Sequence, residues 1–352
     1  MTYVRHCDVA CFAKEILADY ALDAAVVTKV DSGLINATFL ATLENQRFIV
    51  QRVNPIFGPR VNDDIHHVTL YLAEAGMLTP CLLPTSSGQL YTKDNTGQIW
   101  RVMTFIEGVT HERATEPSLC RSAGELVGRF HRIVSTLSYE FLHKRLFIHD
   151  TTRHLATLKE ALSSKRTHAN VAAIAPLGEK ILEQARQLPS LPSLPKRIVH
   201  GDLKISNILF SPEGRALALV DLDTLGKMPL PIELADAWRS WCNPSGEDDP
   251  NAHFRIDYLE AAIVGYAQEA GGLFIESEVS ALPWWLETIA LELAARFCAD
   301  ALLESYFAWD STRFSCRSEH NLVRATSQWR LACQIKEARS TITELVNDTL
   351  MP

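Results

Sequence analysis

One short segment of the chain carries residue types that metal-assisted phosphoryl transfer requires. It contains a His-Gly-Asp triplet that ends at Asp202, an asparagine five residues later at Asn207, and an apolar run that ends at Asp221. Carboxylate and amide oxygens are hard ligands of the kind that Mg²⁺ takes together with phosphate oxygens and water. A further carboxylate beside a metal-bound phosphate can orient and deprotonate an acceptor hydroxyl. The spacing therefore indicates transfer of a phosphoryl group to an alcohol.

A short β-hairpin is predicted to bring these side chains together. The apolar runs that follow Asn207 and precede Asp221 read as strands, and a Ser-Pro-Glu-Gly turn joins them. Asn207 and Asp221 therefore lie at the open end of the hairpin, where Asp202 on the preceding loop can face them. Asp223 lies close by in the sequence. An ordinary hairpin with polar turn caps would explain each residue singly, but not the combination.

The first hundred residues combine strand and helix signals. Asp8 is placed to cap a helix that runs to about Tyr20, and Gly76 is placed to end a second helix. From apolar periodicity and turn residues, we expect strands at 25–30, 37–43, 47–53, 89–92 and 98–105, and the second helix at 61–75.

Beyond Gly108, helical periodicity dominates. Helices are predicted at 118–137, 151–162, 171–188, 252–270, 277–309 and 319–350. Pro283 is expected to break the fifth of these helices. Together the patterns predict an α+β fold of two lobes. Residues 1–105 would form a small lobe around an antiparallel sheet, and residues 106–352 a large, mainly helical lobe.

With these motifs in view, the sequence resembles the aminoglycoside phosphotransferase and choline kinase superfamily. The superfamily pattern is H-G-D-x-x-x-x-N, followed by a strand that ends in Ile/Val-Asp. Further segments resemble the N-acetylhexosamine 1-kinase branch, namely 48–54, 100–108, 221–224, 291–297 and 319–322. The resemblance implies a bilobal protein-kinase-like fold and the use of ATP and Mg²⁺.

The same resemblance implies a role for each residue of the central motif. Asp202 looks like the catalytic base, and Lys204 stands where many kinases carry a lysine near the transferred phosphate. A solvated loop lysine would explain Lys204 equally well. Asn207, Asp221 and Asp223 look like the Mg²⁺ ligands.

The residues expected to bind the nucleotide lie mainly in the N-terminal lobe. They are Gly33 and Asn36 in the loop between the first two strands, Arg52 with Asp63 or Asp64 as its helix partner, and Thr104 and Ile106 beside the adenine. We expect the nucleotide to sit between the lobes, and Asp63 is the better fit of the two acids. The loop has a single glycine, and Leu34 stands where the hexosamine branch commonly has histidine. The absence of D-F-G and A-P-E motifs argues against a protein kinase.

The acceptor pocket is expected on the C-terminal helices. Its candidate residues there are Glu233, Asp236, Trp238 and Arg296, although a buried structural ion pair would explain Asp236 and Arg296 equally well. Asn36, from the loop between the first two strands, is a further candidate. Our first hypothesis is a sugar such as an N-acetylhexosamine, phosphorylated at its anomeric hydroxyl. Choline, an aminoglycoside or homoserine are the alternatives, as is a catalytically inactive nucleotide-binding module. A metallophosphoesterase is discounted because the sequence has no G-N-H triplet.

Composition narrows the class of protein. With 34 Lys and Arg against 42 Asp and Glu, the net charge is −8, which argues against broad binding to nucleic acid or anionic lipid. The eight cysteines form no CxxC pair, which is typical of a reducing compartment. The first 20 residues contain no apolar run of signal-peptide length, and charges interrupt the most apolar helix, 288–303. We therefore expect a cytoplasmic protein whose partner is a small hydroxyl compound.

Overall fold

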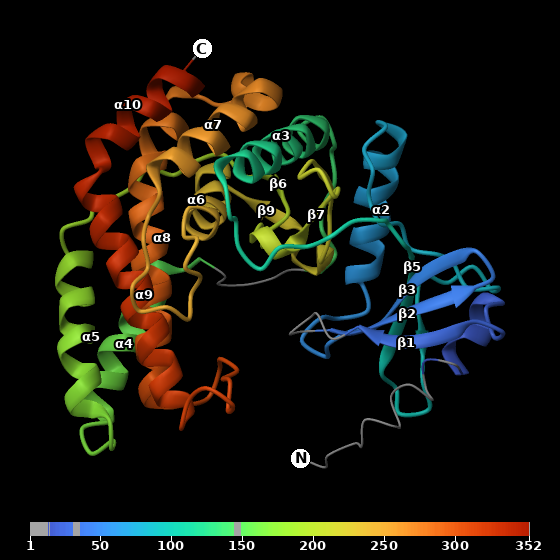
Figure 1. The fold of residues 1–352 in the computed structure, drawn as a ribbon, viewed down its shortest axis with the longest axis horizontal. Coiled ribbons are helices and arrows are strands. Elements are labelled where there is room, and N and C mark those ends of the chain that lie inside the picture. The colour runs from blue at the N-terminus through green and yellow to red at the C-terminus, as the bar shows by residue number, and fades with distance from the viewer. Residues whose placement is uncertain (1–12, 14, 31–35, 144–148, 352) are drawn as a thin grey trace. The chain divides into compact units, whose positions relative to one another are not determined.

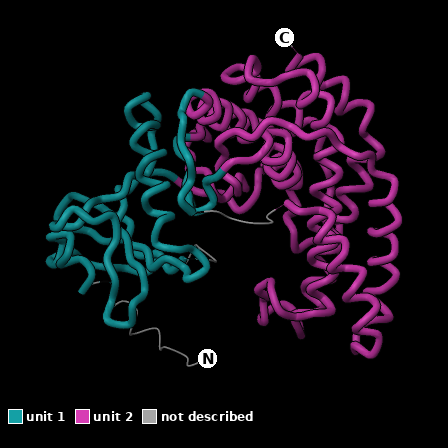
Figure 2. Tube along the Cα trace, turned by 180° about the vertical axis from the view of Figure 1, so that it is seen from behind, with its two compact units in different colours: residues 1–108, 136–144, 217–226 teal, residues 109–135, 145–216, 227–352 magenta. Residues whose placement is uncertain are grey.

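The computed structural model describes residues 13, 15–30, 36–143 and 149–351, and it divides the chain into two compact units (Figure 2). The first unit comprises residues 1–108, 136–144 and 217–226, and the second comprises the remainder. We expected a single boundary between residues 105 and 106. The first unit instead also contains two later segments, 136–144 and 217–226.

The first unit is built on a five-stranded antiparallel sheet in the order β1-β2-β3-β5-β4 (Figure 1). Its strands are β1 (Val26–Val30), β2 (Ala37–Leu43), β3 (Gln46–Arg52), β4 (Thr92–Lys93) and β5 (Ile99–Thr104). Alternate residues of the central strands, such as Phe39, Val50 and Val102, are buried in one core. This alternation is what a sheet with one covered face requires. Four of the strands agree with the predicted ranges to within one residue. The exception is β4, which begins at Thr92, three residues after the start of its predicted range.

Helical segments of the first unit also include η1 (Ala18–Tyr20) and α2 (Val61–Glu74). The turn η1 contributes Tyr20 to the sheet core. Helix α2 ends just before Gly76, whose backbone is left-handed with φ +76°. The predicted role of Gly76 after the helix end is therefore confirmed.

The second unit is mainly helical (Figure 1). Its helices are α3 (Pro117–Val134), α4 (Thr151–Ser164), α5 (Val171–Ala185), α6 (Leu230–Trp241), α7 (Ile256–Ala270), α8 (Glu276–Leu303), α9 (Arg317–Glu337) and α10 (Arg339–Leu350). The 3-10 turns along the rest of the chain are η2 (Ile205–Asn207), η3 (Leu222–Thr224) and η4 (Gly271–Leu273). Among the described residues, no helix has both the length and the apolar character needed to cross a membrane.

Short strands lie between α5 and α6 in the sequence. Strand β6 (Arg197–Val199) pairs with β9 (Gly226–Met228), and β7 (Ile208–Phe210) pairs with β8 (Ala216–Leu219). The β7–β8 hairpin that we predicted around the central motif is therefore confirmed.

Three helical expectations were wrong. Helix α8 runs through Pro283 without a break. Proline costs a helix one hydrogen bond, but most of α8 is buried against α4, α5, α6, α9 and α10, and this packing outweighs the loss. The last predicted helix is two helices divided at Ala338, and α6 was not among the predicted ranges.

Helices α3 and α7 approach each other closely because glycines line their contact. A Cβ atom at Gly124 would lie 2.3 Å from the carbonyl oxygen of Ala262, and one at Gly265 would lie 2.1 Å from that of Arg121. Both distances are far below van der Waals contact, so neither position accepts a larger residue without movement of the helices.

Candidate active site

Asp202 lies on the loop between β6 and η2, and its two carboxylate oxygens have different surroundings. Oδ2 accepts a hydrogen bond from Nδ2 of Asn207 at 3.0 Å and lies 3.1 Å from Nζ of Lys204. Oδ1 accepts no hydrogen bond from any described residue, and 27% of the side chain is exposed. One oxygen is thus held in place while the other remains available to accept a proton, which is the arrangement that a general base needs.

Asn207 is buried at the end of η2. Its Nδ2 donates to the backbone oxygen of Asp202 at 2.8 Å as well as to the Asp202 carboxylate. Its Oδ1 accepts no hydrogen bond within the described parts of the chain. An amide oxygen without a protein donor is a suitable Mg²⁺ ligand.

The loop around Asp202 is held at three successive residues. Gly201, which has φ +84°, donates its backbone N–H to Oε1 of Glu233 at 2.6 Å. The backbone N–H of Asp202 donates to Nδ1 of the buried His200 at 3.3 Å. The oxygen of Leu203 accepts from Nε1 of Trp241 at 2.6 Å. Helix α6 supplies two of these anchors, from Glu233 and Trp241.

Glu233 was expected in the acceptor pocket, and the structure contradicts this expectation. Its carboxylate is fully buried, with one oxygen on Gly201 and the other 2.6 Å from Nε2 of His131. Both oxygens are therefore occupied by the protein itself, and the side chain serves the loop instead of a ligand.

Asp221 follows β8 and is one of four non-glycine residues with a positive φ in the part of the chain that the structure describes. Its φ and ψ are +61° and +55°. Such a conformation costs about 1–3 kcal/mol and concentrates at functional sites. It starts η3, which carries Asp223 two residues later, and the side chain of Asp221 is partly exposed.

Asp223 is fully buried and forms an ion pair with Arg101 of β5. Nη1 of Arg101 lies 2.6 Å from Oδ1 of Asp223, and its Nη2 lies 2.8 Å from Oδ2. Nδ2 of Asn36 also donates to Oδ2 at 2.6 Å, while Oδ1 of Asn36 accepts the backbone N–H of Asn54 at 2.8 Å. These contacts occupy the carboxylate that we expected to bind metal and the amide that we expected to bind nucleotide and acceptor. Both expectations are corrected by the buried network.

Replacing Arg101 with Met is expected to lower the free energy of unfolding by about 3–5 kcal/mol, because it leaves the buried Asp223 carboxylate unpaired. Arg52→Met is the control, since Arg52 lies on the adjacent strand β3 and forms no ion pair with a described residue. The double variant Arg101→Met/Asp223→Leu should regain much of the loss, because an apolar pair replaces the buried charges. Urea unfolding measures all three. Equal destabilisation by Arg101→Met and Arg52→Met would contradict the role of the pair.

We expected Arg52 to form an ion pair with Asp63 or Asp64 of α2. Among the described residues, it does not. Asp63 lies 4.0 Å from Arg60 on an exposed turn of α2. Asp64 is buried. It accepts hydrogen bonds from the hydroxyl of Tyr139 and from the backbone N–H groups of Leu142 and His143. The arginine that is buried in the first unit is therefore Arg101. Its ion pair is with a residue far along the chain, and no pattern in the neighbouring sequence predicts it.

Thr104, Ile106 and Gly33 are the remaining candidates for nucleotide binding. Thr104 ends β5, where its hydroxyl accepts the backbone N–H of Cys81 at 2.9 Å, and Ile106 is partly exposed beyond it. Gly33 lies outside the described residues. The proposed contact of this stretch with adenine remains a prediction.

Asp236 and Arg296 belong to one charged cluster in the second unit, together with His149. Burial alone would raise the pKa of Asp236, but the charges of Arg239, His149 and Arg296 outweigh it and lower that pKa. Burial alone would lower the pKa of His149, but its hydrogen bond to Glu292 and the charge of Asp236 outweigh it and raise that pKa. The ion partner of Asp236 is Arg239, whose Nη2 lies 2.9 Å from Oδ1 of Asp236, and the charge of Arg296 also acts on Asp236.

Arg296 packs against an aromatic segment that the sequence did not suggest. Its guanidinium carbon lies 5.5 Å from the ring centre of Phe307 and 5.9 Å from that of Tyr306. It forms no hydrogen bond or ion pair with the part of the chain that is described. Tyr306 is largely exposed. The predicted helix extends to residue 309, whereas α8 ends at Leu303. Because of this error, nothing in the sequence indicated a separate aromatic segment after the helix.

Asp300 explains how the aromatic segment is held. Its carboxylate accepts the backbone N–H groups of Ser305, Tyr306 and Phe307, and the side-chain amide of Asn321. Together with the Ser305 hydroxyl, these donors on one buried carboxylate fix the chain just after α8. Tyr306 and Phe307 are therefore presented beside Arg296 by backbone contacts.

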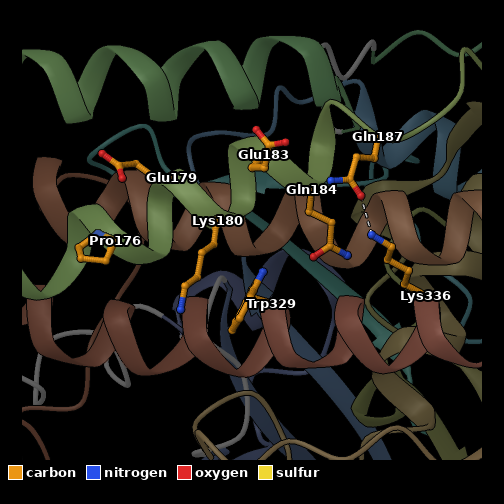
Figure 3. A pocket seen from close by; sticks show the side chains of 8 residues that line it. All are labelled: Pro176, Glu179, Lys180, Glu183, Gln184, Gln187, Trp329 and Lys336. Carbon is orange, nitrogen blue, oxygen red and sulfur yellow. Dashed lines mark hydrogen bonds between the residues drawn. The ribbon is translucent and has the colours of Figure 1, made fainter.

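A separate hollow of about 490 Å³ lies between α5 and α9 (Figure 3). Side chains of mixed charge line it, including Glu179 and Lys180, together with Trp329 of α9. A hydrogen bond of 2.6 Å joins Gln187 and Lys336 at one end. The hollow contains none of the motif residues, so it does not mark the chemistry.

Comparison with known proteins shows similarity to phosphotransferases. Residues 26–271 match the family described as the phosphotransferase enzyme family. A homoserine kinase of Caulobacter sp. (strain K31) is 26% identical over 255 residues, which is 71% of this chain and 74% of that protein.

Solved structures share the fold at low sequence identity. A choline kinase from Cryptosporidium parvum superposes with a TM-score of 0.60 and 15% identity, covering 99% of this chain and 100% of that one. An amicoumacin kinase in complex with AMP-PNP and Ca²⁺ gives 0.57 and 15%, with 88% of each chain covered. The predicted kinase-like α+β fold is confirmed by these similarities.

Proposed function

The chain belongs to the phosphotransferase enzyme family and is a small-molecule kinase, and from this premise we propose that it transfers the γ-phosphoryl group of Mg²⁺-bound ATP to a hydroxyl of its acceptor. The observation that carries the proposal is the asymmetry of Asp202. Asn207 and Lys204 hold one carboxylate oxygen, and the other is open to accept the proton of an acceptor hydroxyl. Lys204 lies close enough to Asp202 to offset charge on the incoming phosphate.

We assign the divalent cation to Asn207 and Asp221. The amide oxygen of Asn207 has no donor among the described residues, and Asp221 carries a partly exposed carboxylate on a strained backbone. No group of three or more His, Cys, Asp or Glu side chains suited to a metal occurs in the described ranges. Mg²⁺ needs only one or two carboxylate or amide ligands when phosphate oxygens and water complete its shell. When bound, the cation neutralises charge on the transferred phosphoryl group.

Asp223 takes a positioning role in this proposal. Its carboxylate is already occupied by Arg101 and Asn36, so it anchors the segment that follows Asp221 to the sheet of the first unit. An amicoumacin kinase of the same fold binds AMP-PNP and Ca²⁺, which supports the use of a nucleotide and a divalent cation here.

An N-acetylhexosamine is our first candidate for the acceptor. Asn36, Arg101 and Asp223 come from or beside segments that resemble the hexosamine kinase branch, and they join in one buried network. The segments are thus linked physically as well as by sequence. Asp236 and Arg296 offer an acceptor and a donor for the hydroxyl and acetamido groups of such a sugar.

Homoserine is the second candidate. Several curated relatives carry the name homoserine kinase, and the opposite charges of Asp236 and Arg296 would suit the ammonium and carboxylate of an amino acid. Under either candidate, Arg296 and Tyr306 would contact the acceptor, since Arg296 has no partner among the described residues besides the aromatic rings.

An acceptor panel tests the proposal. The purified protein is incubated with Mg²⁺-ATP and one acceptor at a time: N-acetylhexosamines, homoserine, choline and an aminoglycoside. ADP release and the phosphorylated product are both measured, so that background hydrolysis of ATP is recognised. We expect acceptor-dependent product with one class of compound. Binding of ATP without product from any acceptor would favour an inactive nucleotide-binding module.

Replacing Arg296 with Met is expected to raise the KM of the active acceptor by about 10–100-fold, because a charged hydrogen bond of about 1.5–3 kcal/mol is lost. The KM of ATP should change little. Arg313→Met is the matched control, since Arg313 also stacks on an aromatic ring, that of Phe314, but is more exposed. An unchanged acceptor KM in Arg296→Met would remove Arg296 from the pocket.

A further inference from the structure

A buried glutamate holds one imidazole ring of the second unit. Nδ1 of His149 lies 3.1 Å from Oε1 of Glu292 on α8, and the hydroxyl of Thr151 donates to Oε2 of the same carboxylate at 2.6 Å. The side chains of His149 and Glu292 are only 9% and 1% exposed. Because a carboxylate accepts and does not donate, Nδ1 of His149 carries a proton. Both oxygens of Glu292 are therefore occupied, and the orientation of the ring is fixed.

The second nitrogen of this ring, Nε2, forms no hydrogen bond with any residue that the structure describes. Polar groups that are nine-tenths buried normally have a hydrogen-bond partner, so an unused nitrogen here indicates a place for a ligand. A neutral ring with its proton on Nδ1 can only accept at Nε2, whereas a protonated ring donates there. The protonation state of His149 therefore decides which kind of ligand atom the ring can bind.

Charged groups from three helices act on the ring. Glu292 and Arg296 lie one turn apart on α8, and Asp236 lies on α6, which packs against α8. On α4, Nε2 of His154 lies 4.0 Å from Oε1 of Glu292. Burial and the charge of Arg296 act to lower the pKa of His149, but the hydrogen bond to Glu292 and the charge of Asp236 raise it by more. The ring therefore keeps its proton to a higher pH than an ordinary histidine does.

Two further polar groups of this cluster are not used by the protein. Oδ1 of Asp236 accepts hydrogen bonds from Arg239, but Oδ2 accepts none from the described parts of the chain. Within the same parts, Arg296 contacts only the rings of Tyr306 and Phe307. One carboxylate oxygen and one guanidinium thus remain available beside the imidazole. Together they offer a ligand one hydrogen-bond acceptor and two cationic donors.

We propose that His149 is a specificity-determining residue of the acceptor site, where its Nε2–H donates to an oxygen of the acceptor while Glu292 holds the ring through Nδ1. The inference rests on the proposed role of Asp236 and Arg296 in binding the acceptor. A cationic donor binds best to a carboxylate or to the carbonyl oxygen of an acetamido group. The site therefore selects acceptors that carry such an oxygen, and it disfavours choline, which has a quaternary ammonium instead.

His149→Asn tests the proposal, because the side-chain amide of asparagine can replace Nδ1 at Glu292 whereas nothing replaces Nε2. At a pH below the pKa of His149, we expect the KM of the active acceptor to rise by about 10–100-fold, since a charged hydrogen bond is lost. The kcat and the KM of ATP should change little, because the lost contact serves the acceptor alone. An unchanged acceptor KM would overturn the role of His149.

The pH profile of the wild type gives a second measurement. Because only the protonated ring donates, the acceptor KM of the wild type should rise as the pH increases through the pKa of His149, until it equals the KM of His149→Asn. Glu292→Gln keeps an oxygen for Nδ1 but removes a charge that favours the protonated ring, so its rise should begin at lower pH. A wild-type KM that follows the same pH dependence as that of His149→Asn would contradict the proposal.

His154→Asn is the matched control, since His154 is the other histidine beside the Glu292 carboxylate. We expect this variant to keep the acceptor KM and the pH profile of the wild type. An equal rise of KM in His154→Asn and His149→Asn would show that disturbance of Glu292, and not loss of Nε2, is the cause, and it would overturn the proposal.

A measurement without turnover separates this inference from the proposed function. The NMR signals of the His149 ring, assigned by their loss in His149→Asn, are followed while each compound of the acceptor panel is added. We expect them to move with an N-acetylhexosamine or with homoserine and not with choline. A wild-type protein without turnover would contradict the proposed function, whereas signals that move with no compound of the panel would overturn the role of His149.

Discussion

Replacing Asp202 with Asn is expected to reduce kcat by about 10²–10⁴-fold, because a carboxamide cannot take the proton of the acceptor hydroxyl. The amide oxygen can still accept the hydrogen bond that Asn207 now gives to Oδ2, so the loop should keep its shape. The affinity for Mg²⁺-ATP should therefore remain close to that of the wild type. Steady-state kinetics and titration calorimetry with a non-hydrolysable nucleotide measure the two quantities separately.

A matched control distinguishes loss of the base from loss of charge. Asp257→Asn removes one negative charge from an exposed residue of the same unit, whose only described ion pair is with Arg255. We expect this variant to keep wild-type turnover. Wild-type turnover in Asp202→Asn would show that the carboxylate is not the base, whatever the nucleotide affinity.

Replacing Asp221 with Ala is expected to weaken the binding of Mg²⁺-ATP by about 100-fold or more, since even the outer partners of metal ligands contribute about 10–100-fold. Binding of ATP in the absence of divalent cation should change far less, because the lost group acts on the cation. Calorimetric titrations across a series of Mg²⁺ concentrations separate the two effects.

The left-handed backbone of Asp221 calls for a second variant. Alanine at φ +61° remains strained, so Asp221→Ala alters only the side chain, whereas Asp221→Gly also relieves the strain. Both variants should lose Mg²⁺-dependent affinity to a similar degree if the carboxylate is the ligand. Asp63→Ala, which removes an exposed acid from α2, is the control. Normal Mg²⁺-ATP affinity in Asp221→Gly would refute the assignment.

The local parts of this molecule were predictable from sequence. The strands 37–43 and 99–104 follow from alternating apolar residues, and the β7–β8 hairpin follows from the turn between its strands. The contact of Asp202 with Asn207 was expected from their spacing of five residues along one loop. Each of these features depends on neighbours in the chain, which a pattern of residue types can encode.

The long-range parts were not predictable. Arg101 and Asp223 are 122 positions apart, and nothing near either residue in the sequence indicates that they pair. Glu233 was expected in the acceptor pocket, yet its carboxylate contacts His131 and Gly201. The unbroken course of α8 through Pro283 depends on packing partners far along the chain. Tertiary contact decided each of these cases against the local signal.

The Arg101–Asp223 pair also has a consequence for biosynthesis. The sheet of the first unit is complete in sequence by residue 104, but the partner of its buried arginine comes 122 residues after Arg101. During synthesis, more than a hundred further residues must therefore leave the ribosome before Asp223 can neutralise the Arg101 guanidinium. A fragment that stops at Gly108 would carry an uncompensated buried cation. Nascent chains shorter than 223 residues should accordingly remain sensitive to protease and dependent on chaperones.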